Sequence, residues 1–271
     1  MKIRIRFSKT GPIRFAGHLD FQRTFQKAVK KSGLPAVYTS GFNPHMLMSF
    51  AAPLGVGEET TGDYADIEFA FRDPFPMSEH DAYRLKDIGL DNETLPPPPR
   101  ADVFTEILNS AMPEGVRTDG AVRIGQTRNS KAMALVRYAS WLLVPGDRFL
   151  SSLTGPAFAE MLSRFSAEEK IIICKKTKKA EKETDIRPMI RELGTEAGSL
   201  PTFIGDSGFT PGRSVILTCS CGSTENLKPA AAMEAFCSYA GLPYDPYGFR
   251  TIRTETFDAD MRPLLALGSG F

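Results

Sequence analysis

The sequence lacks the segments that would place it in a membrane or outside the cell. No stretch of 18 consecutive apolar residues occurs in its 271 residues, and the first 11, MKIRIRFSKTG, have no apolar centre of the kind found in secretory signals. Four cysteines are too few for a disulfide framework. We therefore expect a cytoplasmic protein with no membrane partner, whose core comes from its 42% of hydrophobic residues.

Motifs of several large enzyme classes are also missing. The chain contains no phosphate-binding loop of the Walker type, no G-x-S-x-G, no C-x-x-C and no G-x-G-x-x-G. It also lacks C-x-x-x-C-x-x-C, the three-thiolate motif that holds the iron–sulfur cluster of a radical S-adenosylmethionine (SAM) enzyme. We expect no cofactor in this chain.

Acidic residues are almost absent from the first 50 positions. This segment carries nine Lys or Arg against a single acid, Asp20, so its formal charge is +8, and the rest of the chain sums to −7 because the total is +1. Such a basic segment is typical of a polyanionic partner, most often nucleic acid, whose phosphates attract it over about 10 Å. The alternative is a basic face that the acidic remainder of the fold neutralises.

The first 71 residues have the pattern of a β-α-β-β unit. Residues 2–8 alternate apolar and basic side chains, which predicts a strand with one buried and one basic face. Residues 19–32 have apolar side chains at helical spacing, with cations on the other side. Two strand-like segments follow, HMLMSFAA and DYADIEFAF, and the second is expected to turn Asp66 and Glu68 outward.

A proline-rich run, LPPPPR, interrupts this pattern, and we place a domain boundary there. The expected domains are residues 1–95 and 96–271. The second contains strands and helices that alternate in short units. The predicted fold class is α+β, with two ferredoxin-like (split βαβ) halves whose antiparallel or mixed sheets are backed by helices.

Three polar residues near the predicted helix are candidates for catalysis. His18, Asp20 and His45 are the residue types of a two-histidine, one-carboxylate iron site, or of an acid and a base. In a simpler interpretation, His18 and Asp20 cap the helix and His45 holds a loop. We favour no metal over a metal at these three residues.

Further cationic and polar residues form a candidate binding set for phosphate. They come from the first strand, the helix and the turn SGFNPH, and from residues 175–191, where seven cations against three acids give a charge of +4. That later segment is either a second phosphate-contacting patch or a solvated loop. The candidate substrate-binding residues are Arg4, Arg6, Arg23, Lys27, Lys31, Ser40, Asn43, Lys178, Asp185 and Arg187.

Three blocks of the sequence carry a family resemblance. GPIRFAGHLDFQRTFQKAVKKSGLPAVYTSGFNPHMLMSFAAPLGVG followed by DYADIEF, then TKKAEKETDIRP, then NLKP with IRTETF, resemble the radical-SAM-associated (radical SAM-linked) protein family, a domain of unknown function. Gly17 stands where that family usually has serine, and residues 58–61 also depart from its pattern. The resemblance implies a radical SAM partner that holds the iron–sulfur cluster and S-adenosylmethionine, in an RNA-modification setting.

A weaker likeness links the first strand, the basic helix and GFNPHMLMSF to tRNA pseudouridine synthases, whose fold also has two ferredoxin-like halves. Those enzymes need a loop aspartate, which SGFNPH does not offer. Our leading hypothesis is an RNA-binding accessory protein that works with a separate radical SAM enzyme in tRNA or rRNA modification. The alternatives are a stand-alone RNA-modifying or metal-dependent enzyme that uses His18, Asp20 and His45, and a protein-docking module for the radical SAM partner.

Overall fold

The computed structural model describes residues 1–73, 86–87, 89, 91–125, 127–146, 155–176, 181–195 and 208–271. The chain divides into two compact units. Unit 1 comprises Met1–Val136 and Phe257–Phe271, and unit 2 comprises Arg137–Thr256. This division differs from the boundary we expected after residue 95. The helix that follows the proline run packs on the sheet of unit 1, and the next strand pairs with the first strand of that sheet.

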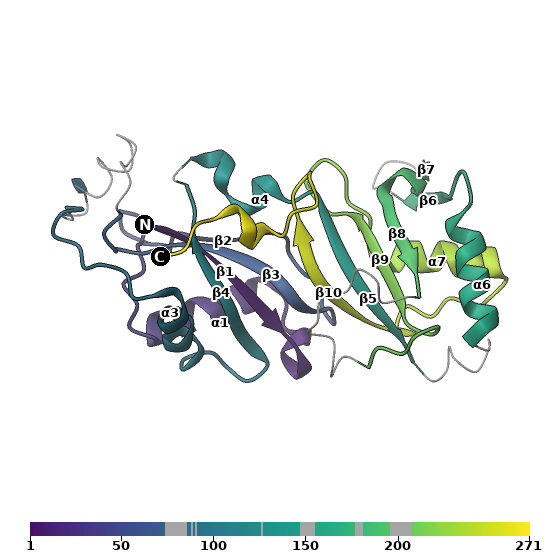
Figure 1. Cartoon of the computed structure of the whole chain (residues 1–271), viewed down its shortest axis with the longest axis horizontal. Coiled ribbons are helices and arrows are strands. Elements are labelled where there is room, and N and C mark those ends of the chain that lie inside the picture. The colour runs from purple at the N-terminus through teal and green to yellow at the C-terminus, as the bar shows by residue number, and fades with distance from the viewer. Residues whose placement is uncertain are drawn as a thin grey trace. The chain divides into compact units, whose positions relative to one another are not determined.

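Unit 1 is an antiparallel sheet backed by helices (Figure 1). Strands β1 and β3 pair along most of their length, β4 pairs with the other edge of β1, and β2 pairs with the other edge of β3. The elements are β1 (Lys2–Lys9), η1 (Gly11–Phe15), α1 (His18–Lys31), β2 (Met48–Phe50), β3 (Glu59–Glu68), α3 (Ala101–Asn109), β4 (Val116–Arg123), η2 (Arg128–Ser130), α4 (Ala132–Leu135) and η5 (Leu264–Leu267).

Helices α1 and α3 pack on one face of this sheet and form its core. The apolar side chains of β1 meet those of α1 and α3 in one buried cluster, which includes Ile3, Ile5, Phe7, Phe21, Phe25, Phe104 and Leu108. Phe7 makes ring contacts with Phe21, Phe25 and Phe50 at centroid distances of 5.3 to 5.7 Å. The predicted helix is therefore confirmed, and the four apolar residues that defined its inner face are all buried.

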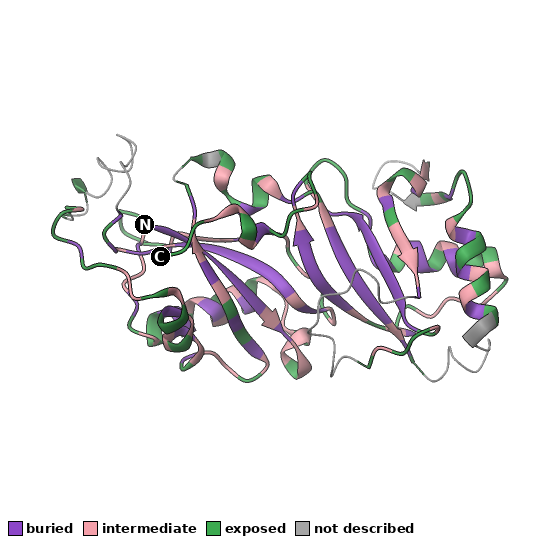
Figure 2. Cartoon of the chain, in the orientation of Figure 1, coloured by how far each residue is buried: buried purple, intermediate pink, exposed green. Residues whose placement is uncertain are grey.

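The opposite face of the sheet is also covered, which corrects one expectation from the sequence. Strand β1 is buried on both faces (Figure 2), so its basic side chains do not face solvent as predicted. Residues of η5, η2 and α4 lie against them: Arg4 donates to the carbonyls of Leu264 and Ser130, and the Ala132 backbone N–H donates to Asp66. The expectation that Asp66 faces outward is wrong for the same reason.

Unit 2 also consists of paired strands with helices of its own. Its strands run in the order β10-β5-β9-β8, and β6 and β7 form a separate antiparallel hairpin. Its helices α6 and α7 pack together: the ring of Phe236 on α7 contacts the rings of Phe158 and Phe165 on α6. Gly241 ends α7 with a left-handed φ of 68°. The elements are β5 (Tyr138–Pro145), α6 (Gly155–Ser166), β6 (Ile172–Lys176), β7 (Glu181–Asp185), η3 (Arg187–Met189), β8 (Ile190–Gly194), β9 (Val215–Ser220), α7 (Pro229–Ala240) and β10 (Phe249–Phe257).

The strands of the two units share one connectivity. When the paired strands of each unit are numbered by their order in the chain, with the β6–β7 hairpin left out, both units have the spatial order four-one-three-two. A helix follows the first strand and another follows the third in each unit. The predicted α+β class, with a mostly antiparallel sheet backed by helices, is confirmed at this level. Among the described helices, none combines the length and apolar character needed to cross a bilayer.

Candidate functional site

The cations of β1 are partners of acids on the neighbouring strands. Arg4 has no exposed side-chain surface, and its guanidinium donates twice to Asp66, at 2.8 and 3.1 Å. Arg6 pairs with Asp119 on β4. Lys2 lies opposite Glu68 in the β1–β3 register and pairs with it at 3.5 Å. Arg4 and Arg6 therefore have structural roles, and we drop them from the set of phosphate contacts.

Two further cations of the basic segment, Lys9 and Arg14, bond to neighbouring residues of unit 1. The Nζ of Lys9 donates to the carbonyls of Arg14 and Ala16, at 3.3 and 3.1 Å, and Arg14 pairs with Glu59 at 3.2 Å. Burial lowers the pKa of the Lys9 ammonium, and the negative charges of Glu58 and Asp63 partly offset this effect. Five of the nine cations in residues 1–50 are thus bonded to acids or carbonyls and are at least partly buried.

The other four cations line the outward face of α1. Arg23, Lys27, Lys30 and Lys31 are all exposed and recur at helical spacing, so they form one stripe on that face. Arg23 forms an exposed ion pair with Asp20 at 3.4 Å. The described residues supply no acidic partner for the three lysines. We call these four residues the α1 stripe.

The turn SGFNPH lies at the same end of unit 1 as the last residues of the α1 stripe. Residues 39–45 form a turn closed by two hydrogen bonds: the Thr39 N–H donates to the His45 carbonyl, and the His45 N–H donates to the Thr39 hydroxyl. The chain enters it through Val37, whose N–H donates to the carbonyl of Glu68, opposite the start of β1. Helix α1 returns to this end from the other end of β1. The turn exposes Ser40, Phe42, Asn43 and His45.

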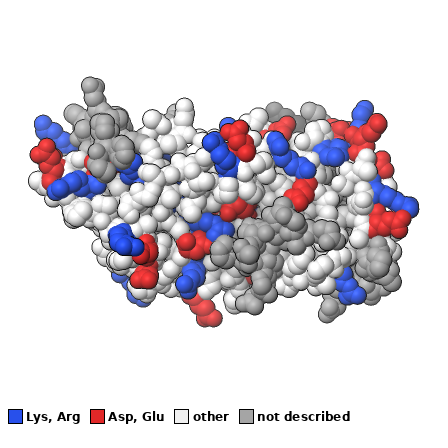
Figure 3. Space-filling view, in the orientation of Figure 1, with Lys and Arg blue, Asp and Glu red and all other residues white. Residues whose placement is uncertain are grey.

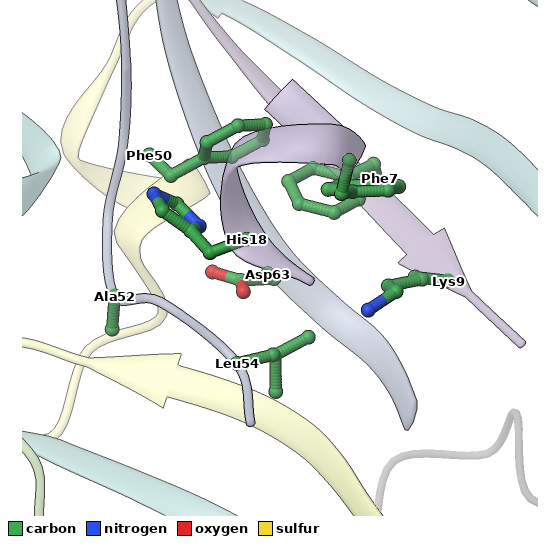
Figure 4. Close-up of a pocket in the computed structure, with 8 residues that line it drawn as sticks. Phe7, Lys9, His18, Phe50, Ala52, Leu54 and Asp63 are labelled. Carbon is green, nitrogen blue, oxygen red and sulfur yellow. The ribbon is translucent and has the colours of Figure 1, made fainter. Parts of the chain in front are cut away.

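His18 lies at the opposite end of unit 1, in a small pocket (Figure 4). Its ring packs against Phe50 with centroids 5.6 Å apart, and Lys9 and Asp63 contribute the other polar side chains. The cavity of about 10 Å³ has room for about one water molecule. A histidine that lies near a carboxylate and an ammonium is a residue type that can exchange a proton with such a water.

The three candidates for an iron site do not come together. Asp20 faces solvent on α1 with a 73% exposed side chain, whereas His18 points into the pocket. His45 lies five positions before Phe50, the neighbour of His18, and at the rise of an extended chain this is on the order of 15 Å. Within the described residues, no group of three or more His, Cys, Asp or Glu is arranged to hold a metal ion. Nor do His18 and Asp20 cap the helix, whose N-cap is Gly17 without a side-chain bond.

The predicted patch in residues 175–191 is described only in part. Lys178 lies outside the described residues. Asp185 accepts hydrogen bonds from the backbone N–H groups of Ile171 and Arg187, both at 3.0 Å, and these bonds lower its pKa. The Arg187 guanidinium donates to the carbonyl of Ile190. In this structure the D-I-R-P sequence builds the turn between β7 and β8.

A family model matches residues 2–82 and 87–229. The chain belongs to the DUF2344 family. The family is described as an uncharacterized protein conserved in bacteria. The DUF2344 match includes the α1 stripe, the SGFNPH turn and the pocket around His18. A comparison with curated proteins finds no match to this chain.

Sequence reasoning about this DUF2344 chain missed Lys9 and Asp63 as pocket residues. They meet His18 through the pairing of β1 with β3, in which Phe7 lies opposite Asp63. Lys9 and Asp63 are 54 positions apart in the printed sequence. The signal that could have found them is the pairing of two predicted strands, KIRIRFS and DYADIEF, in an antiparallel register.

Proposed function

We propose that this DUF2344 protein is an RNA-binding accessory protein that works with a separate radical SAM enzyme in tRNA or rRNA modification in the cytoplasm. The observation that carries the RNA part is the α1 stripe, where four cations face solvent and three have no acidic partner in the described structure. Unpaired cations at helical spacing neutralise the phosphates of a nucleic acid and release its counterions. On the face drawn in Figure 3, by contrast, basic and acidic side chains are interspersed.

The SGFNPH turn favours RNA over an acidic protein as the partner of the stripe. Phe42 is fully exposed at its tip, with a relative exposure of 110%. An exposed aromatic ring at the same end of the unit as a row of cations offers a stacking platform for unpaired bases. Asn43 and His45 on the same turn add hydrogen-bonding groups. We therefore propose that the bound RNA is single-stranded where it meets this turn.

Two finer parts of the proposal rest on topology and resemblance. The strand order four-one-three-two in each unit supports two ferredoxin-like halves. The fold-level likeness to tRNA pseudouridine synthases has the same support and carries no catalytic residue. The radical SAM partner rests on the sequence resemblance. That partner would hold the iron–sulfur cluster and S-adenosylmethionine.

A salt series with matched variants tests RNA binding. Filter binding of total RNA is measured for the wild type and for a variant with all four residues of the α1 stripe changed to Gln. The slope of log affinity against log salt should fall by about 3 in the variant, since each lost phosphate contact removes about 0.7. The control changes four other exposed cations to Gln: Arg117, Lys131, Lys170 and Lys228.

The two variants lose the same formal charge, so only the position of the charge distinguishes them. Wild-type affinity that does not depend on salt would refute the proposal, as would equal effects of the two variants. Mass spectrometry of nucleosides from a deletion strain, complemented with each variant, then tests the modification step. A modification that is missing in the deletion strain should return with the control and not with the α1-stripe variant.

Protein docking is a second candidate function, favoured by an apolar surface at the start of α1. Phe15, Leu19 and Val56 are each more than 60% exposed. The backbone bond from Gly57 to Arg14 ties the loop of Val56 to the helix of Phe15. Co-purification of the radical SAM partner after nuclease treatment tests it. Docking predicts that Phe15→Ser with Val56→Ser abolishes co-purification while the α1-stripe variant does not.

A further inference from the structure

A cavity of about 350 Å³ lies in unit 1, away from both sites described above. Its lining includes both Met1 and Phe271, and the N and C marks lie close together in Figure 1. Five segments line it: the start of β1, the residues after β3, the prolines before α3, the end of β4 and the last three residues. The lining residues are Met1, Arg72, Pro97, Pro98, Arg123, Ser269, Gly270 and Phe271.

The walls of this cavity are held in place by bonds that involve several elements. Arg123 and Ser269 exchange two backbone hydrogen bonds, at 2.8 and 2.9 Å, and the Arg123 guanidinium also donates to the Ser269 hydroxyl. The Phe271 ring packs edge-on against Phe104 of the core, with centroids 5.7 Å apart. Pro97 is followed by a second proline, and both rings have a fixed φ. These bonds fix the walls that β4 and the last residues of the chain contribute to the cavity.

The lining contains two arginines, Arg123 and Arg72, and only Arg72 has guanidinium donors without an acceptor among the described residues. The guanidinium of Arg123 is occupied by Asp73 at 3.0 Å and by Ser269. Arg72 is exposed, and its Nη2 donates to the carbonyl of Glu93 at 2.8 Å. Among the described residues, no acceptor meets its Nε or Nη1. The remaining lining is mostly apolar, from Met1, the two prolines and the Phe271 ring.

We propose that this cavity binds a small amphipathic anion. Its apolar body, of the size of one or two rings, packs between Met1, the two prolines and Phe271. Its single carboxylate or phosphate binds the Arg72 guanidinium. The volume lies at the low end of the range for small-molecule sites, which are mostly apolar with a few convergent polar groups. The proposal does not depend on RNA binding, because the α1 stripe contributes no lining residue.

Two dyes of the same shape test the proposal on the full chain. Anilinonaphthalene sulfonate has an aromatic body with one anionic group, and N-phenylnaphthylamine has the same body without the charge. Fluorescence titration of the wild type should give saturable binding of the sulfonate with one site per chain. Arg72→Gln should weaken the sulfonate at least about tenfold and leave the neutral dye unchanged, because a charged hydrogen bond is lost.

A cavity-filling variant locates the binding. Gly270 lines the cavity, and a Cβ added there meets nothing within 4 Å, so Gly270→Leu adds a side chain at the cavity wall without a clash and should abolish binding of both dyes. The control is Gly194→Leu, at another glycine whose Cβ would meet nothing within 4 Å. Displacement of the sulfonate by phenylacetate or by phenyl phosphate identifies the head group.

Three outcomes would overturn the proposal. The first is the absence of saturable sulfonate binding. The second is equal binding by Gly270→Leu and Gly194→Leu. The third is displacement by benzyl alcohol at the same concentrations as by either anion, which would remove the role of the charge.

Discussion

Strand β1 and helix α1 each carry four cations, and the fold uses them in opposite ways. On β1, Lys2, Arg4, Arg6 and Lys9 are all buried and bonded to acids, carbonyls or both. On α1, the stripe faces solvent and only Arg23 has an acidic partner in the described structure. The two elements lie within the first 31 residues, so local composition does not separate them. What separates them is whether a distant segment covers the side chains.

The same charge therefore has different energetic roles in the two elements. A buried guanidinium is stable only with its partners in place, and removing one member of such a pair costs about 3–5 kcal/mol. An exposed ion pair such as Arg23 with Asp20 contributes less than about 1 kcal/mol. We expect β1 substitutions to change stability and α1 substitutions to change binding, and each prediction below tests one side of that contrast.

The largest effect is expected for Arg4→Met. The variant leaves the Asp66 carboxylate buried with one partner fewer, and also removes the bonds to Leu264 and Ser130. The free energy of unfolding in urea should fall by about 3–5 kcal/mol. Arg23→Met is the matched control and should change it by less than about 1 kcal/mol. Equal losses in the two variants would contradict the contrast between strand and helix.

The next largest effect is expected for Phe42→Ala. A base stacked on an aromatic ring contributes about 1–3 kcal/mol, so affinity for single-stranded RNA should fall between about 5-fold and 150-fold. Stability should not change, because the ring is fully exposed. Phe15→Ala, which removes another exposed ring, is the control for fluorescence-anisotropy titrations. If Phe15→Ala lowers the RNA affinity and Phe42→Ala does not, the RNA binds at the start of α1 rather than at the SGFNPH turn.

A smaller effect is expected for single lysines. Lys27→Ala should lower the salt slope of RNA binding by about 0.7, the contribution of one phosphate contact to a single strand. Lys2→Ala should leave the slope unchanged, because its ammonium faces Glu68 and is nearly buried. Titrations at several salt concentrations measure both slopes. If Lys2→Ala lowers the slope as much as Lys27→Ala, the buried strand contributes to the interface.

The fold could be predicted from the sequence only as far as local periodicity reaches. The spacing of Phe21 and Phe25 predicted α1 and its inner face, and both residues are buried as expected. The alternation in β1 predicted the strand and did not show that η5 covers its basic face. Leu264 of η5 is 260 residues from Arg4 in the chain, and no local pattern links them.

The candidate site was predicted in part. His18 does line a pocket, but residues i and i+2 point in different directions on a helix, so Asp20 could not join it there. The H-x-D pattern would share one face only on a strand. Lys9 and Asp63 come to His18 through strand register, which a single sequence does not fix.

The smallest effect is a pH dependence at Lys9, the β1 cation nearest to His18. Burial lowers the pKa of its ammonium below 10.5, against the opposing charges of Glu58 and Asp63. Between the lowered pKa and 10.5, the folded protein has released this proton and the unfolded chain still holds it. The unfolded state then binds more protons, so stability rises with pH in this window. Lys9→Met removes the titrating group.

The difference in unfolding free energy between wild type and Lys9→Met should therefore shift in favour of the wild type as pH rises from neutral toward 10.5. Urea denaturation at a series of pH values measures this difference. Lys27→Met, a change of the same side chain on the solvent face of α1, is the control. A Lys9→Met difference that stays constant or turns against the wild type over this range would show that the ammonium is solvated. In that case Lys9 would belong with the α1 stripe rather than with the buried cations of β1.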